Sequence, residues 1–297
     1  MATLPAREDW SGLLDLALAE DIGTGDLTSS LVIDPDRDGQ ARIEARAPMV
    51  VAGLSIVEEV FRRVDPKLTL SCETEIIDGA RVEAGTILLR IQGRYASILT
   101  AERTALNFLG RLCGIATQTR CLVDLVADLK VDLVDTRKTT PGWRILEKYA
   151  VATGGGVNHR VGLYDAILVK DNHIAAAGGL EVAVDRALRQ APAGIAIQIE
   201  VESEEMADRA IDRGASFLLL DNLEPDQIRR IVQRHAPNVL LEASGGIGPQ
   251  NLRAYAETGI ARISMGALTH SAMSADVALE IDLLPNSFNE SDEEKNP

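Results

Sequence analysis

The sequence VDLVDTRKTTPGWRILEKYAVATGGGVNHRVGLYDAILVKDNH spans residues 131–173 and contains two short apolar runs, at 131–134 and 166–169. Arg137 and Lys138 follow the first run, and Lys170 follows the second. Short apolar runs separated by a helical segment are typical of parallel strands joined by crossover helices. The stretch therefore indicates an α/β fold with cations at the carboxyl ends of its strands.

The same alternation continues to residue 265. Runs of strand length occur at 131–135, 166–170, 195–201, 216–221, 238–243 and 261–265, and helical segments at 143–153, 180–190, 203–213, 225–235 and 249–258. This alternation favours parallel pairing with right-handed crossovers. Because these are fewer strands than the eight of a closed TIM barrel, we predict an incomplete, open-faced βα barrel related to it.

The first third of the chain has a different pattern, which predicts an α+β sandwich domain. Alternating segments predict strands at 41–47, 67–73 and 86–94, with a helix at 53–64 and two long helices from 96 to 130, broken near Cys113 and Gly114. We expect residues 1–112 to form this domain, joined by a C-terminal strand at about 272–285. Residues 113–271 would form the catalytic barrel, and the acidic residues 286–297 a disordered tail.

Composition excludes several classes of protein. The chain has 297 residues, 46% of them apolar, and a formal net charge of −15, which argues against binding nucleic acid. No apolar run approaches the roughly 20 residues of a membrane helix, and the N-terminus does not resemble a signal peptide, so we expect a cytoplasmic protein. The three cysteines have no CxxC spacing, which indicates neither a disulfide framework nor a zinc site.

In this acidic chain, five cations are expected in loops or at strand ends near residues 135–170: Arg137, Lys138, His159, Arg160 and Lys170. Together with backbone N–H groups they predict a site for a substrate that carries several negative charges. The alternative is a solvated surface with lysines at strand ends. Cations placed directly after apolar strands, and the run Gly154–Gly156, favour the binding site.

Later strand ends add carboxylates and glycines. Glu200 and Asp221 can hold Mg²⁺ or a ribose diol, or else form structural ion pairs with Lys138 or Lys170. Ser244, Gly245, Gly246 and Gly266 resemble a phosphate-binding pair of loops, although such glycines also permit tight turns. Asp21 and Asp26 lie beside glycines, and we interpret them as turn and capping residues rather than metal ligands.

The ordered motifs DTRKTTPG (135–142), LEKYAV (146–151), GGGVNHR (154–160) and LVKDNH (168–173) closely resemble the quinolinate phosphoribosyltransferase family. The resemblance extends from EDIGTGDLTSS at 20–30 to SMGALTHSA at 264–272. It implies the open barrel. It also implies transfer of a phosphoribosyl group from 5-phosphoribosyl 1-diphosphate to quinolinate, giving nicotinate mononucleotide, diphosphate and CO₂ in NAD biosynthesis.

The resemblance also assigns roles to residues. Arg137, Arg160, His159 and Lys170 would hold the quinolinate carboxylates, with Arg103 reaching in from a partner subunit of a homodimer, which can be part of a larger oligomer. The metal would be Mg²⁺, at Glu200 and Asp221, and no organic cofactor is implied. Lys138 and Lys170 are placed to meet phosphate oxygens.

Arg103 has a second interpretation, and Gln198 departs from the pattern of the family. From sequence alone, Arg103 is equally consistent with a surface ion pair to Glu102. Gln198 precedes Glu200 on the same strand face, where the family often has Glu, a departure that can alter the charge beneath the site.

Two other functions compete with this one. A related phosphoribosyltransferase could act on another acceptor, but the presence of both Arg137 and Arg160 favours a dicarboxylate. A non-catalytic sensor of phosphorylated metabolites should have lost some charged strand ends, and every matched position here is occupied.

Overall fold

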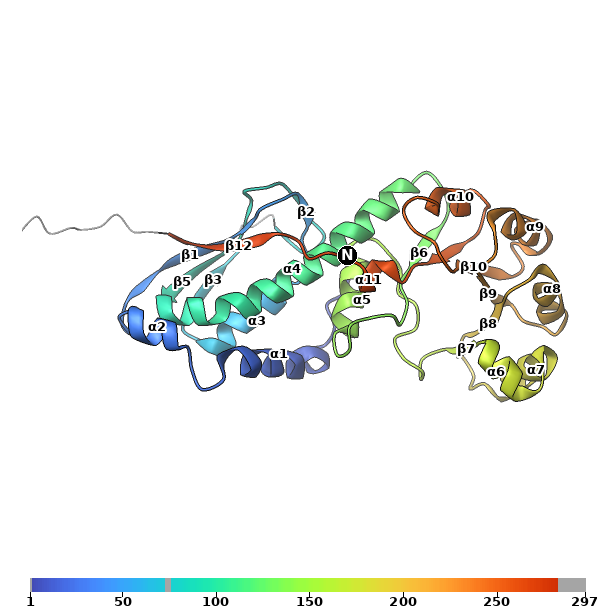
Figure 1. Ribbon diagram of the computed structural model, residues 1–297, viewed down its shortest axis with the longest axis horizontal. Coiled ribbons are helices and arrows are strands. Elements are labelled where there is room, and N and C mark those ends of the chain that lie inside the picture. Colours follow the sequence, from blue (N-terminus) through green and yellow to red (C-terminus); the bar gives the residue numbers. More distant parts are fainter. Residues whose placement is uncertain (1, 73–75, 283–297) are drawn as a thin grey trace, which may run out of the picture. The chain divides into compact units, whose positions relative to one another are not determined.

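The computed structural model describes residues 2–72 and 76–282 and divides into two compact units (Figure 1). The barrel unit comprises Met1–Ser11 and Leu112–Ser274, and the sheet unit comprises Gly12–Arg111 and Ala275–Pro297. The predicted tail at 286–297 and the end of the predicted strand at 272–285 lie outside the described residues.

The barrel unit is built on a parallel sheet that is six-stranded in the described part of the chain, with the order β6-β11-β10-β9-β8-β7. Its strands are β6 (Asp132–Val134), β7 (Ile167–Val169), β8 (Ile197–Val201), β9 (Phe217–Asp221), β10 (Leu240–Ser244) and β11 (Arg262–Ser264). Strands β6 and β7 form the two edges and do not pair with each other, so the barrel is open. The predicted fold class is confirmed, and every strand lies in its predicted run except that β10 extends one residue further.

Helices α7 to α10 follow these strands and pack on one another in sequence order, as a layer beside the strands (Figure 1). The helices after β6 are α5 (Arg144–Thr153), α6 (Asp171–Ala177), α7 (Leu180–Gln190), α8 (Glu204–Asp212), α9 (Pro225–His235), α10 (Leu252–Ala256) and α11 (Ala267–His270). The sequence did not predict α6, because this helix buries none of its residues and so has no periodic apolar face by which it could be recognised.

The sheet has one apolar and one polar face. Ile199, Leu218, Ala243 and Ile263 are fully buried and drive its packing by removing apolar surface from water. On the other face, the register aligns Glu200 with Leu219, Leu219 with Glu242, and Glu242 with Arg262. Since side chains at matching positions of parallel strands point to one face, charged residues share the side opposite that apolar layer.

The sheet unit contains an antiparallel sheet with the order β12-β1-β5-β3 and a short pair, β2-β4, within the described residues. The strands are β1 (Asp38–Ala45), β2 (Met49–Val50), β3 (Thr69–Ser71), β4 (Arg81–Val82), β5 (Ile87–Arg94) and β12 (Val277–Asp282). Strand β12 pairs with β1 from Asp282 opposite Gln40 to Val277 opposite Ala45. The last strand thus joins the first, as predicted.

Four helices accompany these strands: α1 (Arg7–Ile22), α2 (Leu27–Val32), α3 (Leu54–Val64) and α4 (Tyr95–Leu125). The prediction of two helices broken near Cys113 and Gly114 was wrong, because α4 is continuous. Both residues are buried. A helical glycine costs only about 1 kcal/mol relative to alanine, which burial of the surrounding apolar residues outweighs.

None of the helices within residues 2–72 and 76–282 has both the length and the apolar character needed to cross a membrane.

Candidate active site

A buried ion pair supports the loop after β6. Asp135 is fully buried at the end of the strand, and Lys148 of α5 is 2% exposed and donates to it. The Lys148 ammonium also donates to the His159 carbonyl at 2.9 Å. The pair thereby joins the two loops that the sequence predicted to carry the cations.

Burial opposes both charges of this pair. It raises the pKa of Asp135, which the Lys148 charge and hydrogen bond partly offset, and it lowers the pKa of Lys148. A buried pair of this kind is stable only when its remaining lone pairs and protons are satisfied. Asp135 meets that condition: the Asn158 amide donates to it at 2.7 Å and the His159 N–H at 2.8 Å.

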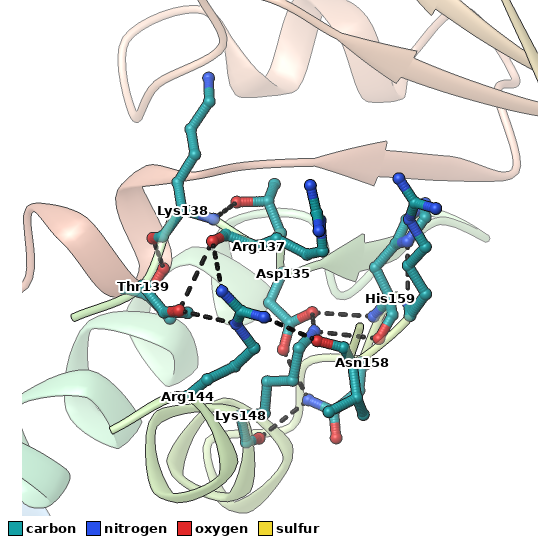
Figure 2. A network of polar contacts seen from close by, with 12 residues as sticks. Asp135, Arg137, Lys138, Thr139, Arg144, Lys148, Asn158 and His159 are labelled. Atoms are coloured by element: carbon teal, nitrogen blue, oxygen red, sulfur yellow. Dashed lines mark hydrogen bonds and ion pairs between the residues drawn. The ribbon is translucent and has the colours of Figure 1, made fainter. Parts of the chain in front are cut away.

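The TRKTTPG loop is tied to α5 by polar contacts (Figure 2). The buried Glu147 accepts from the N–H of Thr140 at 3.1 Å and from its hydroxyl at 2.9 Å. Arg144 donates to the Thr139 hydroxyl at 3.0 Å and to the Val161 carbonyl at 3.1 Å. All three charged residues of this helix, Arg144, Glu147 and Lys148, therefore hold the loops in place.

By contrast, Arg137 and Lys138 extend together to the side opposite Lys148 and Asn158 (Figure 2). In the described ranges 2–72 and 76–282, neither side chain forms an ion pair with a carboxylate. The aliphatic stem of Lys138 lies against Gly266, where an added Cβ would be 3.0 Å from Lys138 Cδ. Adjacent strands β6 and β11 thus bring a cation and a glycine turn together.

Arg160 adds a second guanidinium close to Arg137. Its side chain donates to the Ala166 carbonyl at 3.0 Å. Burial lowers the pKa of Arg160, the positive charge of Arg137 lowers it further, and Asp165 acts in the opposite direction. Two guanidinium groups that repel each other in a partly buried place favour the binding of an anion between or above them.

Lys170 and the two predicted metal ligands lie at the ends of β7, β8 and β9. The Lys170 ammonium donates to Glu200 Oε2 at 2.7 Å, which is one of the ion pairs considered from the sequence. Asp221 Oδ2 accepts from the Asn222 amide at 2.7 Å. The second oxygen of each carboxylate has no hydrogen-bond donor among the described residues.

No group of three or more His, Cys, Asp or Glu residues suited to a metal occurs in the described part of the chain. This donor set fits Mg²⁺ all the same, since that ion is commonly bound through one or two carboxylates, with substrate phosphates and water as its other ligands. Glu200 and Asp221 are such a pair, on one face of neighbouring strands.

His159 forms hydrogen bonds through both of its ring nitrogens. Its Nδ1 accepts from the Arg160 N–H at 2.8 Å, and its Nε2 is 2.8 Å from Gln198 Oε1. Both ring nitrogens are therefore engaged within the protein, and contact of His159 with a substrate carboxylate stays a prediction.

The run of glycines at 154–156 serves packing, contrary to our interpretation of it as part of a binding loop. A Cβ on Gly154 would be 2.5 Å from the Ala116 carbonyl, and a Cβ on Gly156 would be 3.0 Å from Thr119 Cγ2. These contacts show that the turn after α5 is pressed against α4.

The glycines after β10 have the conformation that their turn requires. Gly245 has φ +95° and Gly246 has φ +60°, and a Cβ on Gly245 would be 2.1 Å from Asn222 Oδ1. Asn251 stabilises the loop by accepting from the Gly248 N–H at 2.8 Å and donating to the Gly246 carbonyl at 3.1 Å. The loop is thus preformed, as a phosphate site needs, and the tight-turn interpretation also holds.

Arg103 lies in the sheet unit, on α4, with 65% of its side chain exposed and Glu102 3.9 Å away. This contact is longer than a hydrogen bond and leaves the guanidinium available to other groups.

Sequence reasoning missed several supporting residues: Glu147, Asn158, Glu242, Arg262 and His270. Glu147 and Lys148 in LEKYAV gave a usable signal, because adjacent charges inside an apolar helical segment are out of place on a buried face. His270, beside Gly266 and near Lys138, gave none.

An open parallel βα barrel with cations, carboxylates and glycine turns at the carboxyl ends of its strands defines a transferase or related enzyme that handles anionic, phosphorylated substrates. Comparison with known families narrows this class. The C-terminal domain model of quinolinate phosphoribosyl transferase matches residues 115–280, and the N-terminal domain model matches residues 26–113. The chain belongs to the quinolinate phosphoribosyltransferase family.

Individual relatives agree. A probable nicotinate-nucleotide pyrophosphorylase (carboxylating) of Bacillus subtilis (strain 168) is 42% identical over 94% of this chain and 95% of its own length. The carboxylating enzyme of Mycobacterium leprae (strain TN) is 42% identical over 89% and 94%. The structure of the nicotinate-nucleotide pyrophosphorylase from Francisella tularensis, 38% identical, superposes with a TM-score of 0.89 over 94% of this chain and 98% of that one. The family and enzyme class predicted from the sequence are confirmed.

Proposed function

We propose that this chain transfers the phosphoribosyl group of 5-phosphoribosyl 1-diphosphate to quinolinate, with loss of CO₂, at the strand ends described above. The observation that carries the proposal is the pair Arg137 and Arg160, whose like charges repel each other and neither of which forms an ion pair within residues 2–72 and 76–282. An acceptor with two carboxylates relieves that repulsion and matches the fork geometry of guanidinium groups.

The acceptor site consists of Arg137, Arg160 and Lys170. Lys170 shares its charge with Glu200 at 2.7 Å, so a quinolinate carboxylate competes with an existing partner there. Arg137 has no such partner in the described residues, and it therefore offers the stronger gain on binding. A single carboxylate, as in a monoacid acceptor, would satisfy only part of this set.

The donor site lies at the glycine turns. Ser244, Gly245, Gly246 and Gly266 approach the 5′-phosphate with backbone amides, and Lys138, whose stem lies on Gly266, adds a positive charge. Members of phosphoribosyltransferase families usually work with a divalent metal, and we propose Mg²⁺ held by Glu200 and Asp221. When bound, it offsets the negative charge of the leaving diphosphate.

In the reaction, the pyridine nitrogen forms a bond to C1 of the ribose as the bond from C1 to diphosphate breaks. Positive charge develops on the sugar, and the negative charges of Glu200 and Asp221 stabilise it. Lys138 and Lys170 stabilise the departing oxygens. Attack makes the pyridine ring cationic, so it stabilises the electron pair left on C2 when the 2-carboxylate departs as CO₂, and a proton from water then bonds to C2.

We further propose that the working unit is a homodimer in which Arg103 of one subunit contacts a quinolinate carboxylate in the partner's site. The exposed guanidinium of Arg103, only 3.9 Å from one neighbouring carboxylate, supports its availability for such a contact. We also propose the division at 1–112 and 113–271, and a cytoplasmic location.

The test is incubation of the purified chain with quinolinate, 5-phosphoribosyl 1-diphosphate and Mg²⁺, following loss of quinolinate and formation of nicotinate mononucleotide. We expect turnover that stops on chelation of the metal and returns with added Mg²⁺. Turnover of a different base would indicate a related transferase, and binding of both substrates without turnover would indicate a sensor.

A further inference from the structure

A group of polar residues lies inside the barrel, below the strand ends, and has no part in the function described so far. Glu242 on β10 is fully buried, and Arg262 on the neighbouring β11 donates to its Oε2 at 2.9 Å. The Arg262 guanidinium also lies over the Phe217 ring, 5.7 Å from its centroid. Gln198, 2% exposed, lies on the same face of β8.

His159 connects this group to the acceptor site. Its Nδ1 accepts from the backbone N–H of Arg160, so in the neutral ring the proton is on Nε2. That N–H donates to Gln198 Oε1 at 2.8 Å. The imidazole thus links the interior of the barrel to the residue that carries a substrate-binding guanidinium.

Glu242 has an oxygen that its structural contacts do not explain. Oε2 is bound by Arg262, but Oε1 is buried with no hydrogen-bond partner among the described residues and lies 3.5 Å from His159 Nε2. A buried carboxylate oxygen without a donor is costly unless it acts on a neighbouring group. Its negative charge favours a proton on Nε2 and leaves Nδ1 free to accept from Arg160.

We propose that Glu242 is a positioning residue that acts through His159 to hold Arg160 for the acceptor. Glu242 and Gln198 fix the Nε2–H form of the ring, and Nδ1 fixes the Arg160 backbone. The inference rests on the proposed function, because it takes Arg160 to bind a quinolinate carboxylate. It assigns His159 a role in orientation, without contact to the substrate.

The test uses Glu242→Gln, which keeps the shape and removes the charge. We expect the quinolinate KM to rise roughly tenfold, less than the hundredfold that a misplacement of about 1 Å can cost. The KM for 5-phosphoribosyl 1-diphosphate should stay unchanged. Glu257→Gln is the matched control, since Glu257 accepts from Arg253 at 3.0 Å in an exposed Arg–Glu pair of the same unit, and it should change neither constant.

Nitrogen-15 NMR shows which nitrogen of each histidine ring carries the proton. A purely structural role of Glu242 would leave the proton of His159 on the same nitrogen. The chain has four histidines, and the signals lost in His159→Gln identify the ring of interest. In the wild type we expect the Nε2–H form both before and after quinolinate is added, and a mixture of the two neutral forms in Glu242→Gln. If Glu242→Gln does not fold, the wild-type spectra alone still test the assignment.

Two results would overturn the inference: an Nδ1–H form in the free wild type, or unchanged quinolinate KM and ring signals in folded Glu242→Gln. A large shift of the His159 signals on adding quinolinate would show direct contact instead. If the wild type neither binds nor converts quinolinate, the proposed function fails, which is a separate outcome.

Discussion

Arg137 carries a charge that no carboxylate among the described residues offsets through an ion pair. Its guanidinium extends away from the buried network, has no ion pair among the described residues, and repels Arg160. A guanidinium beside another guanidinium becomes more stable when an anion arrives. Function therefore explains it better than stability does.

We expect Arg137→Ala to raise the quinolinate KM between about tenfold and a hundredfold, because a hydrogen bond to a charged group contributes roughly 1.5–3 kcal/mol. Arg137→Lys should recover only part of the loss, since it lacks the planar fork. The comparison is Arg229→Ala, whose side chain pairs with Asp226 on α9. Steady-state kinetics with both substrates measure the effect, and an unchanged KM would make Arg137 a surface residue.

Lys148, in contrast to Arg137, is buried and paired with a carboxylate, that of Asp135. Lys148→Met removes the ammonium and leaves the Asp135 carboxylate buried, which should lower the free energy of unfolding by about 3–5 kcal/mol. Lys138→Met, an equal change at an exposed residue, should alter it by less than about 0.5 kcal/mol. Chemical denaturation compares the two. Similar losses from both variants would contradict a special role for the pair.

At the scale of elements, the contact between α4 and the turn after α5 determines where the GGGVNHR loop lies. Gly154 has φ −70°, an ordinary helical value, so only steric contact opposes a side chain there. Its nearest neighbours are the Ala116 carbonyl and Thr119 on α4. This packing, and not binding to an anion, accounts for the first glycine of the run.

Gly154→Ala should therefore destabilise the fold by about 1–3 kcal/mol, the usual cost of overpacking. Gly12→Ala is the matched change on α1, where an added Cβ has nothing within 4 Å. It should stabilise the protein by roughly 1 kcal/mol through helix propensity alone. Thermal unfolding of the two variants should shift in opposite directions, and equal shifts would refute the packing argument.

Helix α2 gives a prediction about pH. Asp26 is its N-cap, and hydrogen bonds from the Ser29 hydroxyl and the Ser29 N–H lower the pKa of Asp26 below its ordinary 3.8. Since the folded-state value is the lower one, the ionised carboxylate stabilises the fold above pH 3.8, and this contribution is lost as pH falls through the folded-state pKa.

Asp26→Ala should cost about 1 kcal/mol at pH 7, as loss of a helix cap usually does. The difference from the wild type should begin to shrink below pH 3.8 and should disappear as pH falls through the folded-state pKa, because the wild-type carboxylate is then protonated as well. Denaturation curves at several pH values measure it. A difference that persists at low pH would mean that Asp26 acts through packing. This capping role confirms the interpretation of Asp26 made from the sequence.

At the scale of the whole molecule, the proposed homodimer predicts that two chains complete each site. In mixed homodimers of Arg103→Ala and Lys170→Ala chains, one of the two sites would contain both intact residues if sites are shared. With random mixing, half of the dimers are mixed, so about a quarter of the wild-type activity should return.

Each variant alone should be nearly inactive, and activity should appear only after subunit exchange. Native mass spectrometry of differently tagged chains verifies that mixed dimers have formed. Mixed dimers that stay inactive would show that Arg103 does not act across the interface. Recovery without exchange would point to contamination by wild-type chains.

Several site residues were predictable because their signal is local. Arg137, Lys138 and Lys170 directly follow apolar runs, and the carboxyl ends of parallel strands meet at one edge of a barrel. Glu242 and Arg262 were not predictable, because each sits alone in its strand and their pairing depends on the register of β10 with β11. The same limit applies to His159, because the partners of its two ring nitrogens cannot be inferred from the sequence.

The sequence by itself determined the open βα barrel, the approximate positions of its strands, the family, and which cations and carboxylates lie at the strand ends. These follow from periodicity and from motifs, which are properties of neighbouring residues. Only the tertiary structure showed that α4 is unbroken, that Gly154–Gly156 form a packing contact, and that His159 turns its ring toward Gln198 and Glu242. The physical reason is that such contacts join residues far apart in the chain, and their geometry is decided by packing, which no local pattern records.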